Sequence, residues 1–407
     1  MPVDLRTRRD EDAQPVDAHP FFSENLPEAF EKNRVLIVPG LARLSLRPFT
    51  VRSDDADWTL IPHSDRIEVR AGSDGTGACV VLDADQLSEL VNDQITPMTF
   101  ITAGTLDMPS GGLGDFLDWW TVLRAALDDR PLYVEGMVEL RARDGGPLDL
   151  TSSFTLDDPI EDRSHFLHEA GFLHMRSVFT DSEMAEISND MDAAAADYSD
   201  GDGRSWWAGT RDGERRLVRM QGFDEKSSLT VAMLDDPRFL GLAVASGDGH
   251  QHMGLEGNRI EALIKPVGVV EGISDVPWHK DCSLGRHSYE CCSLTAGISV
   301  TGADARSGQL RVVAGSHRAL IWPALATAER HGLPEVDLPT ATGDVTLHLS
   351  CTMHMAQPPV AGERRVMYTS FRQPGFVQDG DSAARARIRA VREGAYTTVS
   401  QKPGHTG

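Results

Sequence analysis

The stretch from Gly343 to Phe371 decides the fold, and it reads GDVTLHLSCTMHMAQPPVAGERRVMYTSF. Two runs with apolar, β-branched and aromatic residues flank a turn that contains two prolines and a glycine. Such a pattern predicts two strands joined by a loop. From about Glu261 onward, further short strand-like segments are separated by Gly, Pro and Asp clusters, which favours a sandwich or a barrel.

A histidine and an aspartate stand two residues apart in the upstream segment DVPWHKDC, as His279 and Asp281. On an extended strand, residues i and i+2 project from the same face, so the imidazole and the carboxylate can converge on one ion. This spacing alone is a weak signal. His354, in the stretch quoted above, can supply a third ligand and complete the two-histidine, one-carboxylate triad that suits iron(II) oxygenases. His348, six residues earlier, is the competing third ligand.

Such a triad leaves coordination positions for a bidentate 2-oxo acid and for O2. A cationic group is then needed for the far carboxylate, and arginine pairs bidentately with carboxylates better than lysine does. Arg365 lies eleven residues after His354 and is predicted to take this role. Arg364 is the alternative, but strand alternation places it on the opposite face from Arg365. Lys265 is interpreted either as a co-substrate contact or as a structural lysine.

Over residues 160 to 375 the chain resembles the phytanoyl-CoA dioxygenase family. The resemblance rests on HEAGFLHMRSVFTDSEMAEI, on His279 and Asp281, on SGQLRVVAGSHR and on the Gly343-Asp344 pair before the distal histidine. It implies a mixed α+β protein with a C-terminal double-stranded β-helix (a jelly roll, cupin-like) and flanking helices. It also implies Fe(II), 2-oxoglutarate and O2, with His279, Asp281 and His354 as metal ligands and catalytic residues and Arg365 as the co-substrate clamp. The family spacing favours His354 over His348.

Asp281 bears on the reaction, because the related halogenases lack this carboxylate. Its presence favours hydroxylation of a C–H bond, or another oxidation such as desaturation or epoxidation, over halogenation. The expected substrate is a small, fairly apolar metabolite, modified in a natural-product tailoring step. A net charge of −23 argues mildly against a polyphosphate-bearing CoA ester. The rival hypothesis is a non-catalytic lipid- or small-molecule-binding protein with a vestigial jelly roll.

Residues 25–145 are predicted to form a smaller α/β domain. The segment VVLDADQLSELVNDQITPMTFITAGTLDM, with the helix that follows and carries Trp119 and Trp120, resembles sterol-carrier-protein-like domains. That resemblance implies a lipid- or substrate-presenting role. A structural or dimerisation appendage is the favoured interpretation, so a homodimer stays open.

The remaining expectations come from composition and charge. Residues 1–24 are charged and proline-containing and are predicted to be a disordered leader, and residues 160–395 to form the oxygenase domain. The chain has no apolar run of membrane-spanning length, and its acidity disfavours nucleic acid and anionic membranes as partners. Five cysteines without CxxC spacing suit reduced thiols in a cytoplasm.

Overall fold

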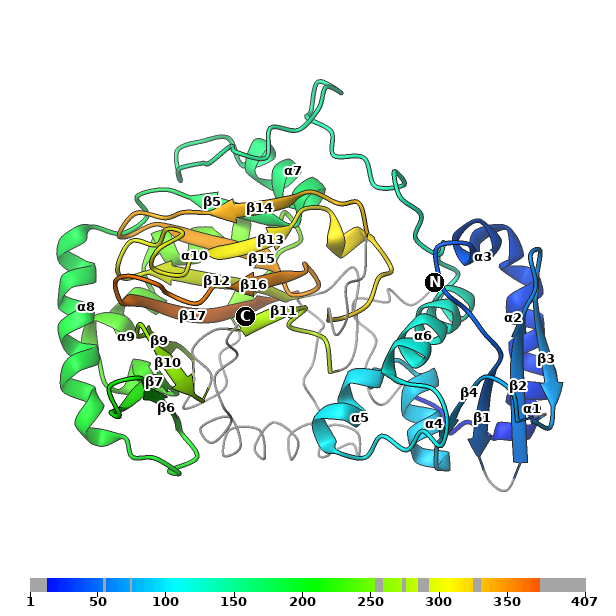
Figure 1. Ribbon diagram of the computed structural model, residues 1–407. Coiled ribbons are helices and arrows are strands. Elements are labelled where there is room, and N and C mark those ends of the chain that lie inside the picture. Colours follow the sequence, from blue (N-terminus) through cyan, green and yellow to red (C-terminus); the bar gives the residue numbers. More distant parts are fainter. Residues whose placement is uncertain are drawn as a thin grey trace.

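The computed structural model describes residues 13–53, 56–73, 75–252, 259–272, 276–284, 293–324 and 331–373 (Figure 1). These residues form a smaller N-terminal part, blue to cyan in Figure 1, and a larger part rich in strands. A search of the described helices finds none with the length and apolar character needed to cross a membrane.

The N-terminal part consists of short helices packed on one sheet. The sheet has the strand order β3-β2-β1-β4, with β1 antiparallel to β2 and parallel to β4. Helix α6 buries the aromatic side chains of Phe116, Trp119 and Trp120. The elements are α1 (Ala18–Pro20), a π-helical turn (Phe21–Asn25), α2 (Leu26–Lys32), α3 (Arg34–Leu41), β1 (Phe49–Ser53), β2 (Ala56–Pro62), β3 (Ile67–Ala71), β4 (Ala78–Val81), α4 (Ala84–Val91), α5 (Pro97–Ala103) and α6 (Leu113–Leu127).

The predicted leader extends too far into the chain. Residues 1–12 lie outside the described residues, but Phe21 and Phe22 are buried and belong to the N-terminal core. The ring of Phe22 stacks on Trp58 of β2, with ring centroids 5.7 Å apart. Two adjacent aromatic side chains gain enough from burial to fold the end of a charged segment onto the sheet.

The resemblance of this part to sterol-carrier-like domains is not confirmed. Its core contains a cavity of about 20 Å³, lined mainly by apolar side chains such as Phe22, Leu87 and Trp120. A volume of that size is roughly what one water molecule needs. A lipid therefore does not fit into this cavity as the structure has it.

The larger part begins after residues 128–159, which form isolated bridges but no helix or strand. Its large sheet has nine strands in the order β10-β6-β7-β9-β17-β12-β15-β5, with β8 beside β17, and its small sheet has the order β11-β16-β13-β14. The strands are β5 (Phe172–Met175), β6 (Ser205–Thr210), β7 (Arg215–Met220), β8 (Gln251–His252), β9 (Glu261–Lys265), β10 (Val269–Glu271), β11 (Val276–His279), β12 (Ser293–Ser299), β13 (Leu310–Val313), β14 (Glu335–Leu338), β15 (Val345–Leu349), β16 (His354–Ala356) and β17 (Arg364–Arg372).

The chain crosses repeatedly between the two sheets. It runs from β9 in the large sheet to β11 in the small one, back to β12, across to β13 and β14, back to β15, across to β16 and finally to β17. The two sheets face each other in Figure 1, with all pairings within them antiparallel. This is the double-stranded β-helix that the family resemblance implies, so the expected mixed α+β class with a jelly roll is confirmed.

Four helices flank the large sheet: α7 (Ile160–Ala170), α8 (Asp181–Ala194), α9 (Ser228–Leu234) and α10 (Pro237–Val244). Thr180 and Glu183 form a capping box at the start of α8. Strand β17 turns one face to these helices, because Phe371 packs on Phe239 of α10 with ring centroids 5.2 Å apart. Met367, four residues before Phe371 and on the same face of β17, contacts Thr230 of α9. The other face of β17 is the interior one.

Candidate metal centre

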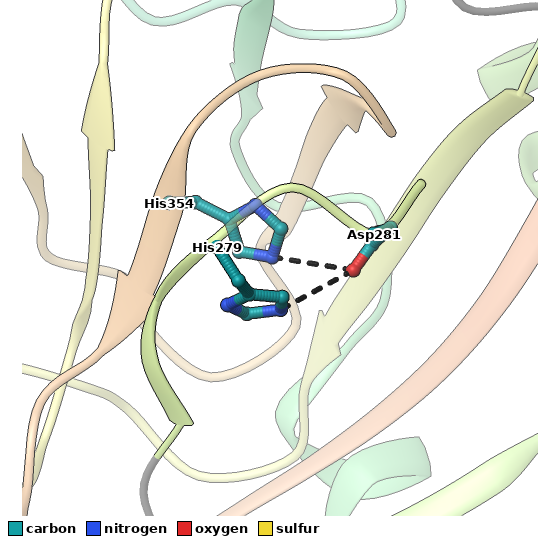
Figure 2. Close-up of side chains that lie close together, drawn as sticks. All are labelled: His279, Asp281 and His354. Atoms are coloured by element: carbon teal, nitrogen blue, oxygen red, sulfur yellow. Dashed lines mark ion pairs between the residues drawn. The ribbon is translucent and has the colours of Figure 1, made fainter. Parts of the chain in front are cut away.

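Three side chains with ligand atoms come together where β11 ends. The register of β11 on β16 places His279 directly opposite His354, and their ring centroids are 4.3 Å apart. The Nε2 atoms of both histidines lie 3.5 Å from Oδ1 of Asp281, as Figure 2 shows. Among the described residues, these three groups are the set whose ligand atoms could hold one metal ion.

Both histidines are held through their other ring nitrogen. Nδ1 of His279 lies 2.7 Å from the carbonyl oxygen of Pro277, and Nδ1 of His354 lies 2.9 Å from that of Thr352. A carbonyl oxygen can only accept, so Nδ1 carries the proton in each neutral ring. The lone pair of each Nε2 therefore faces the carboxylate side of the site, which is the arrangement of metal-ligating histidines.

The two oxygens of Asp281 have different surroundings. Oδ1 faces the two histidines, whereas Oδ2 accepts a hydrogen bond from the Thr295 hydroxyl at 2.7 Å and lies 3.3 Å from Nε2 of His348. Burial alone would raise the pKa of Asp281, but the positive charge of His354 in its protonated form and hydrogen bonds donated by the three imidazoles outweigh it and hold the pKa well below its ordinary value. The carboxylate is therefore ionised, and one oxygen is held while the other is free for an ion.

Lys280 shows how the strand orients its neighbours. Its side chain is fully buried and points away from the site, where Nζ lies 3.3 Å from the carbonyl oxygen of Ser316. The chain is thus still extended enough at Lys280 for His279 and Asp281 to share a face, although β11 ends at His279. This is the alternation from which the sequence predicts the pair.

His348, the competing third ligand, lies beside the centre. Its ring centroid is 4.2 Å from that of His354, and it is buried. It contacts the oxygen of Asp281 that is turned away from the other two histidines, and it does not belong to the group of three. The geometry thus favours His354 over His348 as the third ligand.

The structure contradicts the prediction that Arg365 holds the 2-oxo acid. Its side chain lies on the helix-covered face of β17, where it forms an ion pair with Asp192 of α8 at 2.8 Å and another with Glu363 at 2.9 Å. It also donates to the carbonyl oxygen of Ser188. The prediction failed because a strand alternates its side chains, so a shift of one residue moves a side chain to the opposite face.

Arg364 lies on the interior face instead. On that face Ser370 of β17 pairs with Thr295 of β12, and Thr295 pairs with His348 of β15. Since Thr295 and His348 both contact Asp281, this is the face that carries the candidate metal centre. Arg364 is in phase with Ser370 along the strand and is 3% exposed.

A buried cationic pair forms around Arg364. It stands opposite Lys265 of β9 in the sheet register, and Lys265 is 2% exposed. Arg364 donates to the carbonyl oxygen of Gly308, and Lys265 donates to that of Gln357. In the described part of the chain, Nε of Arg364 and Oε1 of Gln357 are buried without a hydrogen-bond partner.

The distance of this pair from the metal centre follows from the strand. Gln357 comes three residues after His354, which is about 10 Å along an extended chain. The carbonyl oxygen that Lys265 contacts is therefore about 10 Å along the chain from His354.

Thr295 is the site residue that the sequence did not indicate. It stands in the ordinary alternating pattern of β12, fourteen residues after the carboxylate that it contacts. Threonine is common in strands, so neither its type nor its position was a signal.

Comparison with known proteins gives a family for the larger part. Residues 167–367 match the family pattern that is described as Phytanoyl-CoA dioxygenase (PhyH). No curated protein matches the chain at a significant level.

Several solved structures align with part of the chain. AviO1 from Streptomyces viridochromogenes Tue57 has 21% identity and a TM-score of 0.40, over 50% of this chain and 90% of that one. EvdMO1 has 22% identity and a TM-score of 0.43, over 53% of this chain and half of that one. SnoN, described as a non-heme alpha ketoglutarate dependent epimerase from nogalamycin biosynthesis, has 18% identity and a TM-score of 0.40, over 55% and 90% of the two chains. At such values no substrate or reaction carries over.

The family match covers the strands from β5 to the first residues of β17 and includes all three candidate ligands. Fold, ligand geometry and family pattern thus agree. Residues 167–367 of the chain are a domain of the phytanoyl-CoA dioxygenase family, whose members are non-haem iron enzymes that use 2-oxoglutarate.

Proposed function

We propose that this chain is an iron(II)- and 2-oxoglutarate-dependent dioxygenase that hydroxylates a C–H bond of a small, fairly apolar metabolite. The metal ligands in this proposal are His279, Asp281 and His354. The observation that carries it is the convergence of two correctly oriented Nε2 atoms on one oxygen of an ionised carboxylate.

The donor set fits iron(II). Two imidazole nitrogens and one carboxylate oxygen on one side of an ion form the facial arrangement with open positions that non-haem iron oxygenases use. Asp281 suits a single-oxygen ligand, because Thr295 and His348 engage its second oxygen. The same carboxylate occupies the position that a halide would need, which favours hydroxylation over halogenation.

The co-substrate fits the cationic pair of Arg364 and Lys265. A buried guanidinium with an unpartnered Nε, and with a main-chain carbonyl as its hydrogen-bond acceptor, is costly unless an anion joins it. In our proposal the far carboxylate of 2-oxoglutarate would supply that anion, and its 2-oxo acid end would bind at the metal centre. Arg364 therefore replaces Arg365 as the proposed clamp.

In this proposal the chain's own residues hold the metal ligands in place and orient the co-substrate. The Pro277 and Thr352 carbonyls fix both imidazoles, Thr295 fixes the carboxylate, and Arg364 sets the direction of the co-substrate. Bound iron supplies the oxidation chemistry that no side chain can perform.

A non-catalytic lipid-binding role receives no support from the N-terminal cavity, which holds about one water molecule. A direct test of the proposed function is an anaerobic titration of the metal-free protein with iron(II) and 2-oxoglutarate. We expect the metal-to-ligand charge-transfer band of a chelated 2-oxo acid, and its loss in His354→Ala. If the wild-type protein gives no band, the dioxygenase proposal is wrong.

The substrate class is tested separately. Small, fairly apolar metabolites should stimulate succinate formation from 2-oxoglutarate, and the product should gain one oxygen atom by mass spectrometry. Stimulation without oxygen incorporation would point to another oxidation on the same centre and would exclude hydroxylation.

A further inference from the structure

The N-terminal part contacts the turn that carries Asp281. Helix α5 begins with Thr96 as its N-cap, and the hydroxyl of Thr96 donates a hydrogen bond to the carbonyl oxygen of Ser283. The hydroxyl of Thr99, one turn later, donates to the carbonyl oxygen of Leu284. Both threonines are almost completely buried, at 0% and 2% exposure. Two buried donors from one part of the chain thus hold the residues just after a candidate ligand.

These hydroxyls serve two structures at once. Oγ1 of Thr96 accepts from the backbone N–H of Met98, and Oγ1 of Thr99 lies 3.3 Å from the backbone N–H of Thr96, so both cap the first turn of α5. A hydroxyl has one hydrogen to donate, and here it goes to the Asp281 turn in each case. The cap of α5 and the position of the turn are therefore coupled.

A second contact reaches the other ligand of the pair. The indole N–H of Trp322 donates to the carboxylate of Asp118 in α6 at 3.0 Å. The same short segment forms a bridge between Ala324 and His279, and Pro323 accepts the backbone N–H of Lys280 at 2.8 Å. Residues 322–324 thus connect α6 to the end of β11.

The apolar core is continuous at the same place. Leu320 is 4% exposed and is buried in the hydrophobic cluster of the N-terminal part, although it belongs to the segment after β13. Figure 1 shows α5 and α6 on the side of the N-terminal part that faces β11. The contact therefore combines buried apolar surface with three directional hydrogen bonds.

We propose that the N-terminal part is a structural element of the metal centre, and that Thr96, Thr99 and Trp322 are positioning residues for the segment from His279 to Leu284. This rests on the proposed function for the identity of the ligands. The physical reason is that β11 ends at His279, so Asp281 is not held by a strand ladder. Within its own domain the turn has a 2.9 Å bond from the Ser283 N–H to Lys280 and a long 3.4 Å one from Cys282 to Ser350.

The test uses the full chain and the double variant Thr96→Val/Thr99→Val, which keeps the shape of both side chains and removes both donors. The matched control is Thr180→Val, which removes an N-cap hydroxyl of the same kind from α8, where it pairs with Glu183 and not with the Asp281 turn. Both variants should lower the melting temperature. The double variant alone should weaken iron(II) binding in the anaerobic titration, by about tenfold.

A second readout does not need the metal. In the metal-free protein, hydrogen exchange of the amides from 280 to 284 should be faster in the double variant than in the control. If wild-type protein binds no iron, the proposed function fails, and this exchange arm still decides whether the N-terminal part orders the turn. If iron affinity stays within about twofold of wild type and exchange is unchanged, the positioning role is wrong.

Trp322→Phe tests the second contact. It keeps an aromatic side chain and removes the indole donor to Asp118. Its control is Trp119→Phe, which removes an indole bond of the same 3.0 Å length to the carbonyl oxygen of Arg47 inside the N-terminal part. We expect a weakening of iron binding of about twofold to tenfold for Trp322→Phe and none for the control. Equal effects of the two variants would mean that indole loss acts only through stability.

Discussion

The neighbouring arginines of β17 allow the co-substrate site to be tested by two substitutions that differ by one position. Arg364→Gln removes the cation from the interior face, and Arg365→Gln removes it from the helix-covered face. Both residues stand on the same strand and have the same side chain. A difference between the variants therefore reports the face and not the loss of a positive charge as such.

The expected size follows from burial. Arg364 is 3% exposed, its Nε has no partner among the described residues, and a bound carboxylate would form a charge-assisted, two-pronged contact with it. Removing one partner of a buried, hydrogen-bonded charge pair costs about 2–4 kcal/mol. At about 1.4 kcal/mol per factor of ten, the Kd of 2-oxoglutarate should rise roughly 30-fold to 700-fold.

Arg365→Gln should act on stability instead. Its guanidinium holds Asp192 and Ser188 of α8, with its side chain 16% exposed, so its loss should lower the free energy of unfolding by about 1–2 kcal/mol. The Kd of 2-oxoglutarate should stay within about twofold of wild type, because these contacts are on the other side of the sheet.

The assay is an anaerobic titration of the iron-loaded protein with 2-oxoglutarate, followed by the charge-transfer band, with urea unfolding of each variant alongside. The opposite pattern, with weak 2-oxoglutarate binding in Arg365→Gln and normal binding in Arg364→Gln, would refute the assignment of the faces. If both variants bound 2-oxoglutarate comparably weakly, the two arginines would act through the overall positive potential of this sheet edge and not through direct contact.

Further expectations concern the ligands and the stability of the domain. His354→Ala should abolish iron binding, whereas His348→Ala should retain it with an affinity reduced about tenfold; the reverse order in equilibrium dialysis would exchange their roles. Thr295→Val should lower iron affinity about 10-fold without a comparable loss of melting temperature, and an unchanged affinity in the same assay would contradict its role at the carboxylate. Burial lowers the pKa of His317 to about 3 from 6.5, so the unfolded chain takes up a proton that the folded chain does not. The free energy of unfolding should therefore fall with decreasing pH below 6.5, by about 1–2 kcal/mol down to pH 5, and less so in His317→Asn; equal slopes in urea unfolding would speak against it. Gly171→Ala should destabilise the domain by about 2 kcal/mol or more, since φ is 83° there and a Cβ would lie 2.4 Å from an imidazole nitrogen; an unshifted thermal midpoint would show that this packing relaxes freely.

Local patterns of the sequence predict short strands in a sandwich or barrel, and they predict the pairing of His279 with Asp281, which needs only the two-residue period of an extended chain. The jelly roll and the preference for His354 over His348 rest on the resemblance to the phytanoyl-CoA dioxygenase family. The choice between Arg364 and Arg365 depends on the loop before β17, where one residue more or less reverses the face of every later side chain. Counting from His354 could not resolve that.

The contacts across the chain were beyond the reach of local patterns. Thr96 and Ser283 are 187 residues apart, and the capping residues of α5 gave no sign that their hydroxyls also hold a distant turn. The leader prediction failed for the opposite reason. That prediction gave more weight to charge and proline content than to Phe21 and Phe22, although two aromatic residues are enough to extend a core.

The hydrogen bonds between α5 and the turn after Asp281 also limit how this chain can be recombined with others. The family pattern ends at residues 167 and 367, which suggests a domain that could be transferred alone. Cutting the chain there would remove the hydrogen-bond donors to the Ser283 and Leu284 carbonyls, close to the candidate ligand Asp281. It would also expose Leu320, which packs in the core of the N-terminal part. Grafting the jelly roll onto another partner, or exchanging leading domains between homologous enzymes, would have to transfer the first turn of α5 together with α6. The structural unit that holds the candidate metal centre is therefore larger than the region that matches the family pattern.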